Sequence, residues 1–258
     1  MSHHIVEASE LCYTYPSSDC GIQDISFRIT HGESVAVVGA NGAGKSTLLQ
    51  HLNGFLEPSS GFVRIGDYPI TRQNLKAVRR SVGMVFQDPD DQLFMPTVFD
   101  DVAFGPLNLG LTEAEVELKV MHALGTVGVP HLRKRPPYKL SGGEKRAVAI
   151  ATVLAMSPDI LVMDEPTSGL DPKSRSRLIA LLKTFHHTKI VATHDLDMAM
   201  TLCDRTIVLY QGKIVADGPT LELFQDEDLL TRSGLEKPLK MQGCPLCGSK
   251  QSADAPSY

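Results

Sequence analysis

Several things are scarce in this chain of 258 residues. It has no tryptophan, and only 6% of its residues are aromatic. No apolar run approaches the roughly 20 residues that cross a bilayer as a helix. The longest, residues 147–156, is interrupted by the polar Thr152. The start of the chain has neither a basic region nor an apolar stretch, so we expect no signal peptide. Any membrane role is therefore predicted to be peripheral.

Positive charge is also in deficit. Thirty acidic residues outnumber 25 lysines and arginines, for a net charge of −5. This balance argues against a protein that binds nucleic acid through general electrostatics, which needs a basic surface. The cysteine count is odd, which suits a reducing cytosol better than a disulfide scaffold. The five cysteines are scattered at Cys12, Cys20, Cys203, Cys244 and Cys247.

Residues 39–46 contain a glycine, four further residues and then Gly-Lys-Ser, the spacing of a phosphate-binding loop. A strand-like run precedes them and a helix-prone run follows, which is the context that this motif requires. The glycines let backbone N–H groups turn towards phosphate oxygens, and the helix N-terminus adds positive potential. We predict that Lys45 reaches the outer phosphates. The triphosphate is expected to lie among Gly39, Asn41, Gly42, Ala43, Gly44, Lys45, Ser46 and Thr47.

The pattern of apolar residues predicts a mixed fold. Alternating apolar residues near the N-terminus, as in residues 25–29 and 62–65, indicate antiparallel strands with one buried face. In the later half, apolar strands such as residues 160–163 alternate with helices, which predicts a parallel α/β sheet. A helix from Thr112 is expected to begin with a capping box formed with Glu115.

Two acids, Asp164 and Glu165, directly follow the apolar strand at residues 160–163. Ligands collect at the carboxyl ends of strands in such sheets, and buried carboxylates are costly without a partner. We therefore expect Asp164 to hold Mg²⁺ and Glu165 to polarise the water that attacks the γ-phosphate. Without the phosphate loop, a solvated pair of acids at a strand end would be the default interpretation.

Residues 140–144 read Leu-Ser-Gly-Gly-Glu and begin a helix that Ser141 can cap. Taken alone, this is an ordinary capped helix. Between the phosphate loop and the acidic pair, it resembles the signature of the ATP-binding-cassette (ABC) ATPase family. The resemblance covers residues 4 to about 220, and its motifs occur in order. Four further matches support it: Gln87 as the Q-loop glutamine, Asp171 in the D-loop, His194 as the switch histidine and Tyr15 as the aromatic on adenine.

The resemblance implies a P-loop NTPase fold. Its parts would be a RecA-like α/β core, an antiparallel β subdomain and a helical signature subdomain at about residues 88–158. A single nucleotide-binding domain would span residues 1–235. The polar composition after it predicts a flexible tail at residues 236–258.

The resemblance also implies ATP and Mg²⁺ as cofactors and a homodimer arranged head to tail. Each ATP would lie between one chain's phosphate loop and the other chain's signature, which consists of Ser141, Gly142, Gly143 and Glu144. Glu144 stands where glutamine is commoner. The catalytic residues would be Glu165, His194 and Gln87. Ser46, Gln87 and Asp164 would hold Mg²⁺. For the adenine contact, Tyr13 is the alternative to Tyr15.

The segment after Gln87 is similar to that of ATPases of energy-coupling-factor importers, most closely the cobalt and nickel uptake group. This implies a transmembrane coupling subunit and a substrate-capturing membrane subunit as partners, no nucleic acid, and a place on the cytoplasmic face of the inner membrane. We expect an acidic groove with apolar anchors that takes an arginine-bearing helix. The acids of the groove would be Asp88, Asp90, Asp91, Asp100 and Asp101, and its apolar anchors would be Leu93, Phe94 and Met95. A solvated acidic loop is the alternative.

Three alternatives stay open. The chain could serve another ABC importer, for a vitamin or another substrate. It could be a soluble ABC ATPase that acts on DNA, although that class usually carries a long coiled-coil insertion, and no heptad run separates Lys45 from Asp164. It could also be a signalling or translation factor of the same fold, although that class normally carries two cassettes in one chain and this chain has one.

Cys244 and Cys247 form half of a zinc site, which needs four ligands. Two free thiols are therefore the favoured interpretation.

Overall fold

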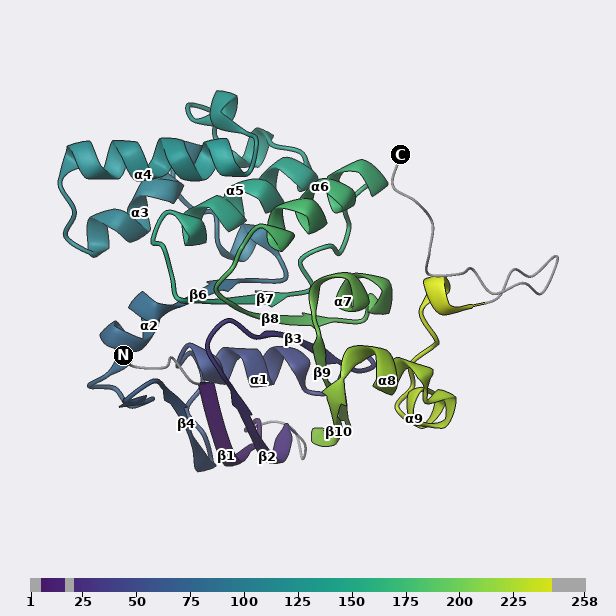
Figure 1. Cartoon of the computed structure of the whole chain (residues 1–258). Helices are drawn as coiled ribbons and strands as arrows, with labels where there is room; N and C mark the ends of the chain where they lie inside the picture. The colour runs from purple at the N-terminus through teal and green to yellow at the C-terminus, as the bar shows by residue number, and fades with distance from the viewer. Residues whose placement is uncertain (1–5, 17–20, 243–258) are drawn as a thin grey trace.

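The computed structural model of the chain describes residues 6–16 and 21–242 (Figure 1). Its central sheet has six strands in the order β10-β9-β3-β8-β7-β6. Neighbours from β9 to β6 are parallel, and β10 pairs antiparallel with β9 at the edge. The strands are β3 (Ser34–Val38), β6 (Val82–Val85), β7 (Ile160–Asp164), β8 (Thr188–Thr193), β9 (Arg205–Tyr210) and β10 (Lys213–Pro219). Every residue of β7 and β8 is buried, as expected for parallel strands covered on both faces.

A second sheet is antiparallel, in the order β2-β1-β4-β5. It consists of β1 (Val6–Tyr13), β2 (Ile22–Ile29), β4 (Ser60–Ile65) and β5 (Tyr68–Pro69). Helix α1 (Lys45–Leu52) lies between the two sheets and contacts both β4 and β7. One hydrophobic core, which includes the fully buried Leu48 and Leu49, joins this helix to both sheets. The phosphate-loop helix is therefore anchored by apolar packing on two sides.

The other face of the central sheet is covered by α6 (Pro172–Lys183), α7 (Leu196–Leu202), α8 (Thr220–Gln225) and α9 (Glu227–Arg232). The short α2 (Leu75–Ser81) leads into β6. No helix within residues 6–16 and 21–242 is long and apolar enough to cross a bilayer. The fold confirms the predicted parallel core with an antiparallel β subdomain.

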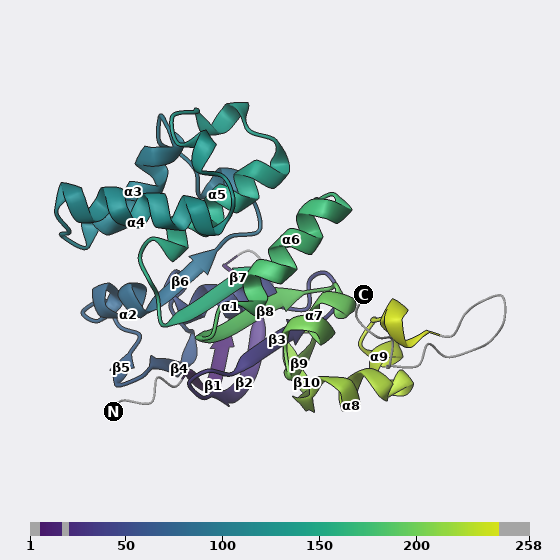
Figure 2. The same cartoon turned by 45° about the horizontal axis from the view of Figure 1, so that its top comes forward.

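A group of helices projects from the core, formed by α3 (Val98–Asn108), α4 (Glu113–Thr126) and α5 (Gly142–Leu154) (Figure 2). These helices contact one another and share a core of their own. The predicted capping box of Thr112 with Glu115 is present, and Ser141, predicted as an N-cap, forms a second capping box with Glu144. Leu93 lies in this core with 7% of its surface exposed. It therefore supports the helices from inside, and its prediction as an exposed anchor was wrong.

Part of the predicted tail is ordered against the core. The backbone N–H groups of Leu239 and Lys240 each donate to the carboxylate of Asp197 on α7, both at 3.0 Å. Leu235, just before the tail, is buried with the residues of the α6–α9 layer. The predicted metal-ligand candidates Cys244 and Cys247 lie outside the described residues.

Candidate active site

The loop between β3 and α1 depends on its glycines. Gly42 and Gly44 have φ of 80° and 103°, a left-handed region that residues with a side chain rarely adopt. A Cβ on Gly39 would lie 2.4 Å from the backbone oxygen of Leu209, so no side chain fits there. The helix begins at Lys45, directly after the loop. Its first N–H groups have no intrahelical partner and are available to an anion.

A cavity of ≈ 450 Å³ opens on this loop, a size typical of small-molecule sites. Tyr15, Gln87 and Glu165 line it from three other parts of the chain. The loop and α1 contribute Asn41, Gly42, Gly44, Lys45, Ser46 and Thr47, and Gly21 adds a position that the motifs did not predict. Ala43 instead packs into the hydrophobic core. The fold thus brings four separate predicted segments into one cavity.

Glu165 has a strained backbone and a well-held side chain. Its φ is +44°, which is uncommon for a residue other than glycine and typical of functional sites. The carboxylate accepts hydrogen bonds from the Thr193 hydroxyl at 3.2 Å and from the backbone N–H of His194 at 3.1 Å. Nδ1 of His194 lies 2.9 Å from Oε1 of Glu165. The glutamate and histidine predicted to act together are therefore in contact.

Asp164 ends β7 in a buried position, 4% exposed. Burial raises the pKa of its carboxyl group, and a hydrogen bond from the Ser46 hydroxyl partly opposes that rise. Its Oδ1 has no hydrogen-bond partner among the described residues. A buried, unpaired carboxylate oxygen beside a serine hydroxyl suits a hard divalent cation, which takes oxygen ligands. These residues fit Mg²⁺.

The two neighbouring tyrosines have different surroundings. The Tyr15 hydroxyl lies 2.9 Å from the Thr47 hydroxyl, and its side chain lines the cavity. Tyr13 packs edge-on against Tyr15 and against the buried His51, with ring centroids 4.9 and 5.0 Å apart. Tyr13 is thus part of the support beneath Tyr15.

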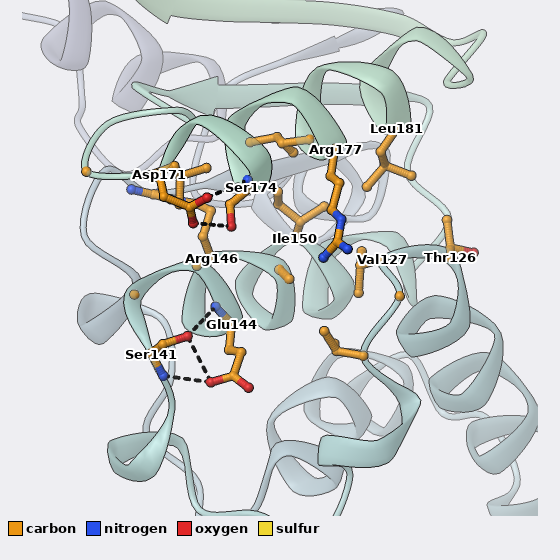
Figure 3. A pocket seen from close by; sticks show the side chains of 18 residues that line it. Thr126, Val127, Ser141, Glu144, Arg146, Ile150, Asp171, Ser174, Arg177 and Leu181 are labelled. Carbon is orange, nitrogen blue, oxygen red and sulfur yellow. Dashed lines mark hydrogen bonds between the residues drawn. The ribbon is translucent and has the colours of Figure 1, made fainter.

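Within one chain, the signature residues lie on a different part of the surface from the phosphate loop. Of the described residues around the loop cavity, none belongs to the signature. Ser141, Gly142 and Gly143 line a cleft of ≈ 720 Å³ between α5 and α6 (Figure 3). Glu144 accepts hydrogen bonds from both the N–H and the hydroxyl of Ser141, which hold the pKa of its carboxyl group below the usual range. Across the cleft, Asp171 caps α6.

The signature helix is tied to the segment around Gln87. Arg146, which is 4% exposed, donates to the backbone oxygens of Phe86 at 2.7 Å and Gln87 at 2.6 Å. Gln92 donates to the backbone oxygen of Ala149 on α5. Arg146 and Thr193 are functional candidates that the sequence motifs did not identify. Arg146 is separated from Phe86 by 60 residues, so local spacing carries no signal for this contact.

Some of the acidic side chains after Gln87 already have partners within the chain. Asp88 accepts from the N–H of Asp90, whose carboxylate is paired with Lys145 at 2.6 Å. Asp88 and Asp91 line a second cavity, of ≈ 350 Å³, which Gln87 also lines.

Two further predicted groove residues differ in exposure. Phe94 is 64% exposed and packs edge-on against Phe104. Asp101, expected as one of the groove acids, is buried and accepts from the N–H groups of Phe94 and Met95. It therefore shapes the turn that carries Phe94, and its prediction as a groove acid was wrong.

A glycine phosphate loop, a buried aspartate at a strand end and a glutamate beside a histidine, all at one edge of a parallel sheet, define a P-loop ATPase. The family model described as ABC transporter matches residues 22–168. The chain belongs to the ABC transporter family, and it is an ATP-binding subunit with ATPase activity.

Two relatives illustrate the similarity. One relative is a Geobacter sulfurreducens protein named as an ABC transporter ATP-binding protein. It is 67% identical over 248 residues, which cover 96% of this chain and 100% of that protein. The energy-coupling factor transporter ATP-binding protein EcfA1 of Methanospirillum hungatei is 46% identical over 240 residues, which cover 92% of this chain and 87% of that protein. The second relative supports the energy-coupling-factor type.

Solved structures agree with this assignment. The structure of cbiO1 from Clostridium perfringens, part of the ABC transporter complex cbiONQ, matches with a TM-score of 0.77 and 40% identity over 89% of this chain and 94% of that one. A dimeric structure of the ATP-binding cassette MJ0796, bound to ADP and Pi, matches with a TM-score of 0.76 and 27% identity, over 83% of this chain and 98% of that one.

Proposed function

We propose that this ATPase powers an energy-coupling-factor importer that takes up cobalt or nickel ions through a membrane coupling subunit. One observation carries the coupling part of the proposal: Gln87 lines both the nucleotide cavity and the neighbouring acidic cavity. A change at the nucleotide would reach the acidic segment through a single side chain. The chain would act as a peripheral protein on the cytoplasmic face of the inner membrane.

The acidic segment offers a docking surface for the coupling subunit. Asp88 and Asp91 supply carboxylates, and the exposed aromatic pair of Phe94 and Phe104 follows them in the chain. A helix that presents an arginine and an apolar side chain would pair with both features, since charge-assisted hydrogen bonds beside an apolar anchor form strong contact points. Asp90 is a weaker candidate because Lys145 already neutralises it.

The separation of signature and phosphate loop supports a homodimer. Ser141, Gly142 and Gly143 line a different cavity from Lys45 within the chain. A second copy, turned head to tail, would place the N-terminus of its α5 against the γ-phosphate. Asp171, at the start of α6 beside the signature, would lie at the same interface. The dimeric cassette among the similar structures supports a dimer.

The chain's own residues would divide the chemistry of hydrolysis among them. Lys45 and the loop N–H groups would bind the outer phosphates, and Tyr15 would contact adenine. Ser46, Gln87 and Asp164 would hold Mg²⁺, which supplies charge neutralisation at the phosphates when bound. Glu165 would polarise the attacking water, and His194 would hold the γ-phosphate and keep the carboxylate in place.

Uptake measurements test this proposal. The chain is co-produced with its coupling and substrate-capturing subunits in proteoliposomes, and radiolabelled cobalt and nickel are offered with ATP inside. We expect accumulation of one ion that is lost with Glu165→Gln. Uptake of a vitamin in place of either ion would assign the chain to another importer. Recovery of the chain only from soluble fractions, bound to nucleic acid, would overturn the transport function.

A further inference from the structure

Arg175 on α6 is joined to the loop that carries His194. Its Nε and Nη2 both donate to Oδ2 of Asp195, at 2.9 and 2.6 Å. Asp195 is also the N-cap of α7, where its Oδ1 accepts from the N–H of Met198 at 2.9 Å. Both carboxylate oxygens of Asp195 are therefore engaged, and its orientation is determined by α6 and α7 together.

The backbone of Asp195 continues the connection to Glu165. Its N–H donates to the Thr193 hydroxyl oxygen at 2.9 Å. Thr193 is fully buried, and its hydroxyl has a single proton. Because the oxygen already accepts from Asp195, that proton is directed to Oε2 of Glu165, 3.2 Å away. A continuous chain of hydrogen bonds thus runs from Arg175 through Asp195 and Thr193 to the carboxylate of Glu165.

We propose that Arg175 is a positioning residue for ATP hydrolysis, which acts on the carboxylate of Glu165 through Asp195 and Thr193. The inference rests on the proposed role of Glu165 as the group that polarises water. The ion pair is partly exposed, with 34% of the Arg175 and 23% of the Asp195 side chain accessible. Pairs of this kind contribute little to stability. Catalysis is far more sensitive, because a displacement of about 1 Å at the reacting groups can cost about a hundredfold in rate.

The position of Arg175 on α6 connects this chain of hydrogen bonds to the signature cleft. Asp171 caps the same helix. Asp171 and Ser174 both line the cleft opposite the signature (Figure 3). The helix is a single rigid element between Asp171 and Arg175. A shift of the α6 N-terminus when the signature side is occupied would therefore move Asp195, and with it the hydrogen bonds that hold Glu165.

The first test compares two basic residues on one helix. Arg175→Gln removes the ion pair, whereas the control Lys183→Gln alters an exposed side chain at the end of α6 that has no hydrogen bond or ion pair among the described residues and does not line the signature cleft. We expect Arg175→Gln to lower kcat about tenfold or more, with KM and nucleotide affinity within about twofold of wild type. Lys183→Gln should match wild type in all three. Arg175→Lys, which keeps the charge, should recover part of the lost kcat.

A double-mutant cycle separates positioning from a general structural role. Asp195→Asn removes the charge but retains an excellent N-cap for α7. If both residues act through one bond, the double variant is no slower than the slower single variant. Losses in kcat that multiply in the double variant, or equal kcat for Arg175→Gln and Lys183→Gln, would overturn the inference. If Arg175→Gln lowers Tm strongly, Arg175→Lys and Asp195→Asn decide the matter by the same kcat criterion.

The proposed role of Glu165 is measured in parallel with Glu165→Gln. Normal turnover in that variant would remove the basis of both proposals. An inactive Glu165→Gln together with a fully active Arg175→Gln would defeat only the positioning role.

Discussion

Nζ of Lys45 lies 3.7 Å from Oε1 of Glu165, and each of these side chains is only 7% exposed. The ammonium expected to bind the outer phosphates and the carboxylate expected to polarise water thus compensate each other in one buried space. Lys45 has two further partners, the backbone oxygens of Gly39 and Ala40. A phosphate group competes with these oxygens for the same cation, so nucleotide binding and the position of Glu165 are linked.

This contact shapes the expected effect of Glu165→Gln. The amide keeps the shape of the side chain but cannot act as a base, so turnover should fall by at least about a hundredfold. Lys45 then faces a neutral group, and ATP affinity should be equal to or greater than that of wild type. Phosphate release and nucleotide binding, measured on the same preparation, check both parts. Turnover within a few fold of wild type would exclude Glu165 as the base.

Asp164→Asn should separate stability from activity. The wild-type carboxyl group is buried with one oxygen unpaired, which disfavours its charged form. Replacing it with a neutral amide should raise Tm in buffer without Mg²⁺ and nucleotide, and lower hydrolysis by at least about a hundredfold. Thermal melts with and without Mg²⁺ provide the measurement. The gain in Tm should be smaller with Mg²⁺, because the ion should stabilise only wild type. A lower Tm in both buffers would show that the charge itself supports the fold.

Glu144→Gln should preserve the signature. The wild-type side chain accepts from the N–H and hydroxyl of Ser141 through one oxygen, and an amide oxygen can do the same. Removing a negative charge from the surface proposed to face the partner's triphosphate should leave KM for ATP equal or up to about threefold lower, most visibly at low salt. Glu144→Ala, which loses the capping box, is the control that should lower Tm. A tenfold rise in KM for the glutamine variant would contradict this account.

His51 should make the stability of the protein sensitive to acid. Burial lowers the pKa of its imidazole from the ordinary 6.5, and the hydrogen bond with the Thr47 backbone oxygen opposes this only in part. The folded state therefore binds the proton more weakly than the unfolded state, so stability is present above about pH 6.5 and is lost as pH falls through the folded-state pKa.

The measurement for His51 is Tm between about pH 8 and pH 5. Wild type should lose more Tm on acidification than His51→Gln, and the exposed His186→Gln should follow wild type. Parallel curves for wild type and His51→Gln would mean that His51 is not responsible.

The proposed docking surface predicts a separation of activities. Phe94→Ala and Asp91→Lys should weaken binding of the coupling subunit by about tenfold or more each, while basal ATP hydrolysis stays within about twofold. Leu118→Ala is a matched control, since Leu118 is 71% exposed on α4 and belongs to no proposed surface. Co-purification from detergent and ATPase assays of the free chain measure the two quantities. Unchanged binding in both variants would place the docking surface elsewhere.

The features that local patterns predict are those built from neighbouring residues. The phosphate loop, the start of α1 at Lys45 and the capping box of Ser141 depend on contacts within a few positions, so sequence spacing identifies them. The parallel sheet follows from apolar strands that alternate with helices.

Other features depend on contacts between distant segments. Leu93 lies in an acidic, loop-like segment and Asp101 in the first turn of α3, yet both side chains are buried. The bonds of Arg175 with Asp195 and of Arg146 with Gln87 join residues 20 and 59 positions apart. Such contacts follow from how the helices pack on the sheet, which residue periodicity does not encode.

Arg146, which donates hydrogen bonds to the backbone oxygens of Phe86 and Gln87, lies within two turns of Ser141 on one helix. An inserted or deleted residue between them would rotate Arg146 by about 100° around the helix axis relative to the signature. Either change would break the hydrogen bonds of Arg146 or turn the helix N-terminus away from its present direction. Over evolutionary time, the spacing between Ser141 and Arg146 should therefore stay constant in length.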